Sequence, residues 1–221
     1  MAYAFLQQAS DGTNLTTYTF AAQNLGSAAA DRFIACTVNG RSSDGGARTI
    51  TSVTIGGVAA TSAGTIANNS GSHDAIYSAA VPTGATGDVV VVWSSTMGDC
   101  TVALHSHNGA FSTTPTSYVT DTATPLSQSI NVAAGGFAVG ISTTDDGTAT
   151  ATWVGITERF DDAAGSGNDQ SGAGDGFATT QTGLTVSCTW TAESRIAFAV
   201  ASFEVPAAAA GHKNLTLLGV S

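Results

Sequence analysis

The sequence predicts an all-β protein: a single-domain, jelly-roll-like antiparallel β-sandwich with an extended C-terminal arm. Turn signals separate β-rich segments roughly every 8 to 12 residues, which is the spacing of a sandwich or jelly roll. No long segment carries the apolar stripe of an amphipathic helix. Only 10% of the residues are charged, against about 25% in average globular domains, so Ser, Thr, Gly and Ala must supply the solvent-facing positions. A chain of 221 residues is a normal length for one large all-β domain.

The central stretch, residues 48–93, carries the strongest strand signals. Its first part alternates apolar and polar residues with the two-residue period of a strand. Gly56-Gly57 follows at once, and two adjacent glycines suit a type I′ turn, in which both residues have positive φ. Residues 89–93 are a continuous β-forming run, which favours a strand buried on both faces. We therefore expect a β-meander here, at the centre of the sandwich.

The remaining elements follow in chain order. Residues 1–14 are expected to form a lead, and residues 15–206 the sandwich domain. Residues 112–124 are polar and predict an edge strand or a long crossover. Further strands are expected over residues 15–20, 31–38, 100–107, 128–132, 137–142, 148–156, 177–180, 184–191 and 195–205. Residues 207–221 then form an alanine spacer and the arm.

Residues 161–176 have a low-complexity composition of Gly, Ser, Asp and Ala. Such a segment buries little apolar surface, so we expect a surface loop. Its acidic side chains invite a calcium-binding interpretation, but neither the EF-hand spacing nor a calcium β-roll repeat is present. A solvated acidic loop is the preferred interpretation. The residues in question are Asp161, Asp162, Asp169 and Asp175.

Charge and cysteine usage restrict the classes of partner. Six basic and sixteen acidic residues give a net charge of −10, which opposes binding to nucleic acid because phosphates must be neutralised by clustered Lys and Arg. No apolar run approaches the roughly 20 residues that span a membrane, and no signal peptide is recognised at the N-terminus. Cys36, Cys100 and Cys188 are expected to be reduced core residues, since no CxxC pair indicates a zinc site.

Few residues suggest chemistry, and we predict neither an enzyme nor a cofactor. His105 and His107 share one face of a strand and would suit a metal, with His73 or Asp99 as third ligand, but uncoordinated histidines are the simpler interpretation. The three glutamates lie on or near predicted strands and could supply paired catalytic carboxylates, but each occupies an expected surface position. The tryptophans are expected in the core rather than on a carbohydrate-binding face. These residues are Glu158, Glu193 and Glu204, and Trp93, Trp153 and Trp190.

The C-terminal tail is apolar, unlike a terminus left free in solvent. It places Leu215, Leu217, Leu218 and Val220 within six residues. Burying these side chains would contribute on the order of 6 to 10 kcal/mol before ordering costs. We expect residues 211–221 to dock on another subunit, for example by adding a strand to a sheet edge. The alternative is that the tail folds back onto its own sandwich.

Four segments resemble virion-associated β-sandwich proteins of tailed phages and prophages from alphaproteobacteria. They are R-T-I-T-S-V-T-I-G-G-V-A-A-T at 48–61, A-I-Y-S-A-A-V-P-T-G-A-T-G-D-V-V-V-V-W-S at 75–94, A-A-G-G-F-A-V-G-I at 133–141 and I-A-F-A-V-A-S-F at 196–203. The resemblance covers about residues 15–205. It implies a structural role in the virion and supplies no catalytic residues.

Together these observations predict a structural protein of a bacteriophage virion, assembled in the host cytoplasm and most simply a capsid decoration or cement protein. Its expected partners are other virion proteins and further copies of itself. One alternative is a receptor- or glycan-binding module of a tail tip or fibre, using Tyr77, Tyr118 or Trp153. A polysaccharide hydrolase with two close carboxylates is the third possibility.

Overall fold

The computed structural model describes residues 3–67, 71–109, 111–163 and 167–205. These residues form seventeen β-strands and no helix, and every strand pairing is antiparallel. The predicted all-β, antiparallel sandwich class is therefore confirmed. The predicted arm, with Leu215, Leu217, Leu218 and Val220, lies outside the described residues.

The strands are distributed over four sheets, two from each half of the chain. The outer N-terminal sheet contains, in spatial order, β2 (Leu15–Asn24), β8 (Thr86–Met97), β4 (Ile50–Ile55) and β5 (Val58–Ala59). The inner N-terminal sheet contains β1 (Ala4–Asp11), β9 (Asp99–Asn108), β3 (Arg32–Arg41), β7 (Ser72–Ala80) and β6 (Thr61–Ala67). The inner C-terminal sheet contains β10 (Ser117–Asp121), β17 (Ala197–Phe203), β12 (Phe137–Thr144), β15 (Asp169–Gly176) and β14 (Glu158–Ala163). The outer C-terminal sheet contains β11 (Leu126–Val132), β16 (Gln181–Trp190) and β13 (Ala151–Val154).

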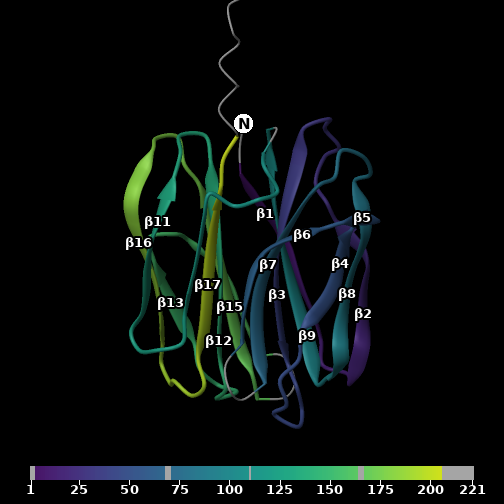
Figure 1. Ribbon diagram of the computed structural model, residues 1–221, viewed down its shortest axis with the longest axis vertical. Coiled ribbons are helices and arrows are strands. Elements are labelled where there is room, and N and C mark those ends of the chain that lie inside the picture. The colour runs from purple at the N-terminus through teal and green to yellow at the C-terminus, as the bar shows by residue number, and fades with distance from the viewer. Residues whose placement is uncertain (1–2, 68–70, 110, 164–166, 206–221) are drawn as a thin grey trace, which may run out of the picture.

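The four sheets stack as layers, so that two β-sandwiches stand side by side (Figure 1). Each sandwich has its own apolar core between its outer and inner sheets. A third cluster fills the space between the two inner sheets, where Phe33 and Ile76 of one half meet Phe137 and Phe203 of the other. The two sandwiches are therefore joined by a buried interface rather than by a linker alone.

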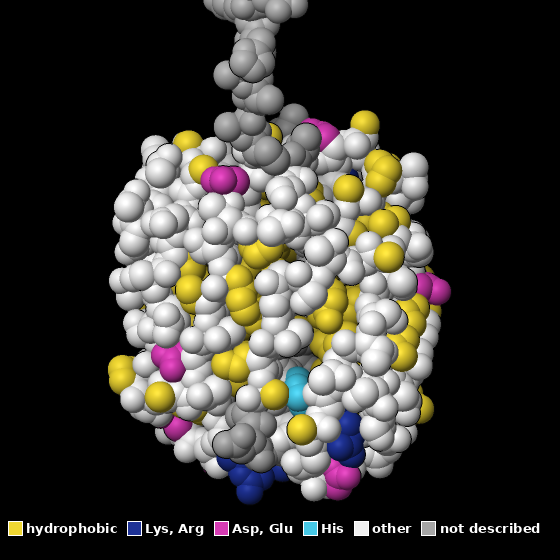
Figure 2. All heavy atoms as spheres, viewed as in Figure 1, with side chains coloured by type: hydrophobic (Ala, Val, Ile, Leu, Met, Phe, Trp, Pro, Cys, Tyr) yellow, Lys and Arg dark blue, Asp and Glu magenta, His cyan; other side chains and the backbone are white. Residues whose placement is uncertain are grey.

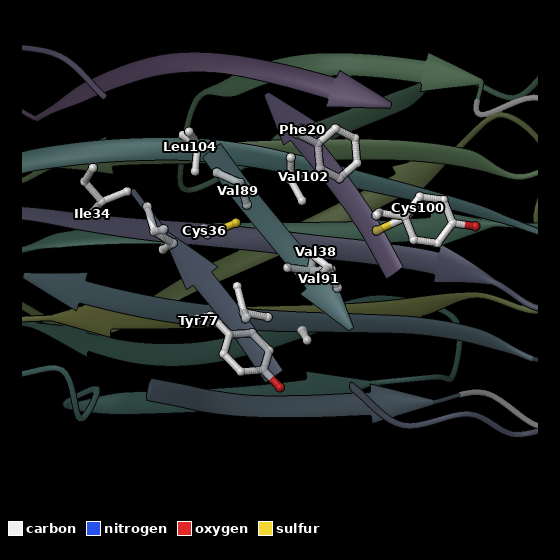
Figure 3. Packing of buried hydrophobic residues seen from close by; sticks show 14 of the residues in the cluster. Phe20, Ile34, Cys36, Val38, Tyr77, Val89, Val91, Cys100, Val102 and Leu104 are labelled. Atoms are coloured by element: carbon white, nitrogen blue, oxygen red, sulfur yellow. The ribbon is translucent and has the colours of Figure 1, made fainter. Parts of the chain in front are cut away.

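Alternation along the strands builds the N-terminal core. On β3, Ile34, Cys36 and Val38 point toward the outer sheet, where Val89 and Val91 of β8 meet them (Figure 3). Successive side chains of a strand point to opposite faces, so Phe33 and Ala35 of β3 contribute to the cluster between the sandwiches instead. Strands of an inner sheet are consequently buried on both faces, as the nine buried residues of β3 show.

The central meander predicted over residues 48–93 is wrong in its pairing. The stretch is divided between two sheets: β4, β5 and β8 lie in the outer N-terminal sheet, while β6 and β7 lie in the inner one. Residues 89–93 are also not buried on both faces, because Val90 and Val92 are only half-buried while Val89 and Val91 are buried. The run belongs to an outer layer. The Gly56-Gly57 turn is confirmed, with positive φ at both residues.

The predicted surface loop over residues 161–176 is also wrong. Its second half is β15, a buried strand in the inner C-terminal sheet that pairs with β12 on one side and β14 on the other. Small residues are used here because neighbouring rings need the space: a Cβ on Gly172 would lie 2.2 Å from Cε1 of Phe160. A Cβ on Gly174 would lie 2.3 Å from the Tyr3 hydroxyl. The glycines therefore fit a packed strand.

Two boundary regions complete the fold. Within the expected lead, β1 pairs with β9, so the folded structure begins before residue 15. The polar segment 112–124 contains β10, an edge strand paired with β17, in agreement with the edge-strand prediction.

Candidate functional site

The interface between the two inner sheets is polar at one end. We define the polar cluster as Thr37, Asn39, Asp74, Thr143, Asn168 and Gln170, each at most 1% exposed. Asn39 and Asp74 come from β3 and β7 of the N-terminal sandwich, while Thr143 and Gln170 face each other on β12 and β15 of the C-terminal one. The stacking of the two inner sheets brings Asn39 and Thr143, which are more than one hundred positions apart in the sequence, into contact.

Three polar groups of the cluster meet at very short range. Thr143 Oγ1 donates a hydrogen bond to Asp74 Oδ1 at 2.5 Å. Asn39 Nδ2 lies 2.6 Å from the same carboxylate oxygen and 2.5 Å from Thr143 Oγ1. On its other side, the Asn39 carbonyl accepts a hydrogen bond of 2.9 Å from Asn168 Nδ2. The contacts of Thr143 with Asp74 and Asn39, and that of Asn168 with Asn39, cross between the sandwiches.

Burial controls the ionisation of the carboxyl in this cluster. Removal from water raises the pKa of Asp74 to about 7, while the hydrogen bonds from Thr143 and Asn39 act in the opposite direction. A buried carboxylate is destabilised because the low-dielectric interior replaces its hydration. At neutral pH, Asp74 can consequently both accept and release a proton.

Several atoms of the cluster have no hydrogen-bond partner. They are Thr37 Oγ1, Asp74 Oδ2, Asn168 Oδ1 and both polar atoms of Gln170. Buried polar atoms normally find partners, so this concentration marks the cluster as unusual within the protein. Four of these five atoms are oxygens, and Asp74 supplies the one carboxylate among them.

The histidines considered as metal ligands contact other groups of the protein and do not converge on a common point. His105 Nδ1 is 2.7 Å from the Tyr3 hydroxyl, and burial lowers the pKa of His105 to about 3. His107 Nδ1 is 2.9 Å from the carbonyl of Asn108. His73 packs against Trp93 in the N-terminal core, so it points to the face of the inner sheet opposite to that of His105 and His107.

The fourth residue considered with the histidines, Asp99, lies six residues from His105 along β9, roughly 20 Å away at the rise of a strand. Across the described ranges, no group of three or more His, Cys, Asp and Glu side chains is placed to hold a metal ion.

The acidic residues proposed for calcium are likewise separated by their own partners. Asp161 and Asp169 accept hydrogen bonds from the backbone amides of Ala151 and Ala149. Asp162 accepts from Gln8 and Ser10 of β1 at 2.5 Å each, which ties β14 to the other sandwich. Asp175 pairs with Arg159 at 2.7 Å. The side chains do not converge on one point.

A cleft of about 520 Å³ lies at the other end of the interface. Its lining consists of Tyr3, His107, Gly135, Asp175, Gly176, Phe177 and Ala178. The Arg159 guanidinium lies 5.3 Å from the centre of the Tyr3 ring and pairs with Asp175, so the charged groups neutralise each other. The volume falls in the usual range for small-molecule sites. A second cleft of about 120 Å³ is lined by residues of β6 and β7 together with Arg48, Thr49 and Ile50.

The residues considered for sugar binding and hydrolysis are not assembled into a site. Tyr77 and Trp153 are buried, and the half-buried Tyr118 packs against Gly64. The three tryptophans are core residues, as expected: Trp93, Trp153 and Trp190.

The three glutamates are also apart from one another. Glu158 is on β14 and Glu204 follows β17, and these strands are three positions apart in the sheet, roughly 14 Å. Glu193 lies after β16 and accepts a hydrogen bond from Thr124. Two carboxylates within the reach that glycoside hydrolysis needs are therefore not formed by Glu158 and Glu204.

Sequence patterns did not indicate the polar cluster. Asn39 and Asp74 lie on strand faces that also carry apolar residues such as Phe33 and Ile76, and only the stacking of the two inner sheets brings them to Thr143. A polar residue interrupting an otherwise apolar strand was the one available signal. Within the described residues, no helix is long and apolar enough to cross a membrane. No family model, curated protein or solved structure matches this chain.

Proposed function

We propose that this chain is a non-catalytic structural protein of a bacteriophage particle, acting as an outward-facing decoration subunit of the capsid. The observation that carries the proposal is the buried interface between the two sandwiches. Four rings from the two halves, Phe33, Phe111, Phe137 and Phe203, pack with centroid separations of 5.2 to 5.8 Å. Such close packing resists relative motion of the halves. A rigid molecule of this kind is suited to form part of a covering layer on a particle.

The surface composition supports the outward placement. Uncharged side chains and backbone cover most of the face seen in Figure 2, with few charged groups. A net charge of −10 disfavours contact with packaged nucleic acid. In this proposal, attachment to neighbouring virion proteins or further copies is made by the apolar arm with Leu215, Leu217, Leu218 and Val220.

The copy number per particle tests this function. Virions or induced prophage particles that encode the chain are purified and the protein is quantified against the major capsid protein. Hundreds of copies per particle, removable without loss of DNA, are expected for a decoration subunit. A copy number of three to twelve would instead indicate a tail-tip part, and absence from the particles would refute a virion role.

The cleft of about 520 Å³ supports a second candidate function, a glycan-binding module. It combines the rings of Tyr3 and Phe177 with the carboxylate of Asp175, and aromatic faces beside carboxylates are suited to sugar rings and their hydroxyls. Binding on a glycan array that is lost in Phe177→Ala would favour this alternative. Unchanged binding in that variant would exclude the cleft as its site.

A further inference from the structure

The polar cluster contains a hydroxyl, a primary amide and a carboxyl in mutual contact, shielded from water. We propose that Thr143 and Asn39 are joined by an ester bond that forms within the folded chain and fastens the two sandwiches to each other covalently. Thr143 is the nucleophile and Asn39 the electrophile. The inference is independent of where the protein sits in a particle.

The nucleophile is close to the carbon it would attack. Thr143 Oγ1 lies 2.5 Å from Asn39 Nδ2, and an amide C–N bond is about 1.3 Å long, so the amide carbon is within about 4 Å of the hydroxyl oxygen. Reacting atoms about 3 to 3.5 Å apart are in near-attack range, so a shift of less than about 1 Å separates these two atoms from that range. β3 and β12 hold the two residues in this position from opposite sides of the interface.

Asp74 is placed to move the proton. Its Oδ1 contacts both the hydroxyl that must lose a proton, at 2.5 Å, and the amide nitrogen that must gain one, at 2.6 Å. Because burial raises its pKa to about 7, the carboxyl is matched to general-base and general-acid work at neutral pH. One carboxyl oxygen can therefore serve both transfers.

Asn168 is placed to stabilise the negative charge of the intermediate. Its Nδ2 donates a hydrogen bond of 2.9 Å to Asn39 Oδ1, the oxygen that becomes the oxyanion when the carbon turns tetrahedral. A fixed donor aimed at that oxygen in a dry site lowers the barrier to acyl transfer. Asn168 is itself fully buried.

The step balances without any further reactant. Thr143 Oγ1 transfers its proton to Asp74 and forms a bond to Asn39 Cγ, and the carbonyl electron pair moves to Oδ1. When the carbonyl re-forms, the C–N bond breaks and Asp74 returns the proton to the departing nitrogen. The products are the Thr143–Asn39 ester and one molecule of ammonia. No oxidant, reductant or cofactor is consumed.

Burial would also preserve the product. Asn39, Asp74 and Thr143 are all fully buried, so the water needed for hydrolysis of the ester is excluded. A disulfide does not serve this purpose among the described residues, since Cys36, Cys100 and Cys188 are free.

Mass spectrometry of the full chain tests the bond directly. The folded protein should weigh less than its sequence by one ammonia, after allowance for removal of Met1. After denaturation, trypsin should release peptide 33–41 covalently attached to peptide 49–159, since Arg32, Arg41, Arg48 and Arg159 bound these peptides. Mild alkali should separate the pair. An intact mass equal to the sequence, or two unlinked peptides, would overturn the proposal.

Asn39 precedes Gly40, and a succinimide at such a pair also loses ammonia. Thr143→Val removes the hydroxyl with little change of shape and should restore the full mass, whereas Thr143→Ser should keep the crosslink. Thr144→Val, at the next buried threonine of β12, is the matched control and should keep it too. If the Thr143→Val variant still weighs one ammonia less than its sequence, the mass loss comes from a succinimide and the ester is refuted. The linked peptides of the native protein decide the matter even if a variant fails to fold.

Discussion

The ring of Phe160 on β14 lies directly over Gly172 on β15, and a Cβ at residue 172 would be 2.2 Å from Cε1 and 2.7 Å from Cζ of that ring. The two residues are neighbours in the register of the strand pair. This contact explains how a segment of glycine, serine and aspartate becomes an ordered strand: its apolar burial is supplied by rings from neighbouring elements. The rings occupy the space that a side chain at each of these glycines would fill.

Replacing Gly172 by Ala should therefore destabilise the protein. The added methyl group displaces the Phe160 ring, and overpacking of this kind costs about 1 to 3 kcal/mol. Urea unfolding of Gly172→Ala and the native protein measures the difference. In a Phe160→Ala background the same change should cost much less, which a double-mutant cycle quantifies. Equal costs in the two backgrounds would show that the ring is not the obstacle.

A pH prediction follows from His105. Burial lowers its pKa to about 3, and the charge of Arg159 acts in the same direction, whereas an unfolded histidine titrates near 6.5. Between these values the unfolded chain binds a proton that the folded chain does not. The stability that His105 contributes is therefore fully present above about pH 6.5 and is lost as the pH falls toward 3. From pH 7 to pH 5 this loss is about 2 kcal/mol.

His105→Phe isolates this contribution, because it keeps a ring beside Tyr3 and Phe5 but cannot be protonated. The free energy of unfolding of the variant should fall by about 2 kcal/mol less than that of the native protein between pH 7 and pH 5. Asp74, whose raised pKa acts with the opposite sign in this window, is common to both proteins and cancels. Parallel pH curves for the two proteins would contradict the assignment.

The cysteines should be reduced and unreactive in the folded state. Cys36 and Cys100 lie in the N-terminal core (Figure 3), and Cys188 lies in the C-terminal one. Burial raises the pKa of Cys36 and of Cys188 to about 12, so the reactive thiolate is scarce. A thiol reagent should label all three only after denaturation. Rapid labelling of the native protein, or a disulfide found under non-reducing conditions, would be inconsistent with this.

The arm is tested by deleting residues 211–221. If it docks on another subunit, the isolated domain should keep its melting temperature within about 2 °C, while oligomerisation or attachment to particles is lost. Replacing Leu215, Leu217, Leu218 and Val220 by Ser is the matched control for length. A badly destabilised monomer would mean that the tail folds onto its own sandwich, and normal assembly of the truncated chain would exclude docking.

Local patterns were sufficient for the β-class and for individual turns. The Gly56-Gly57 turn and the edge strand β10 could be predicted because they depend on φ preferences and on polarity within a few residues. The pairing of strands could not be predicted in the same way. The run at 89–93 has the composition of a doubly buried strand, yet β8 lies in an outer layer, while β15 has the composition of a loop and lies in an inner one.

The all-β class and the core positions of the cysteines and tryptophans could be predicted from the sequence, because alternation, turn residues and apolar content act locally. The presence of two sandwiches whose inner sheets face each other could be established only from the folded structure. That stacking depends on contacts between distant segments, such as Thr143 with Asp74 and Phe33 with Phe137. Neither residue of such a pair carries a local signal of its partner, so the polar cluster forms only once the sheets have packed.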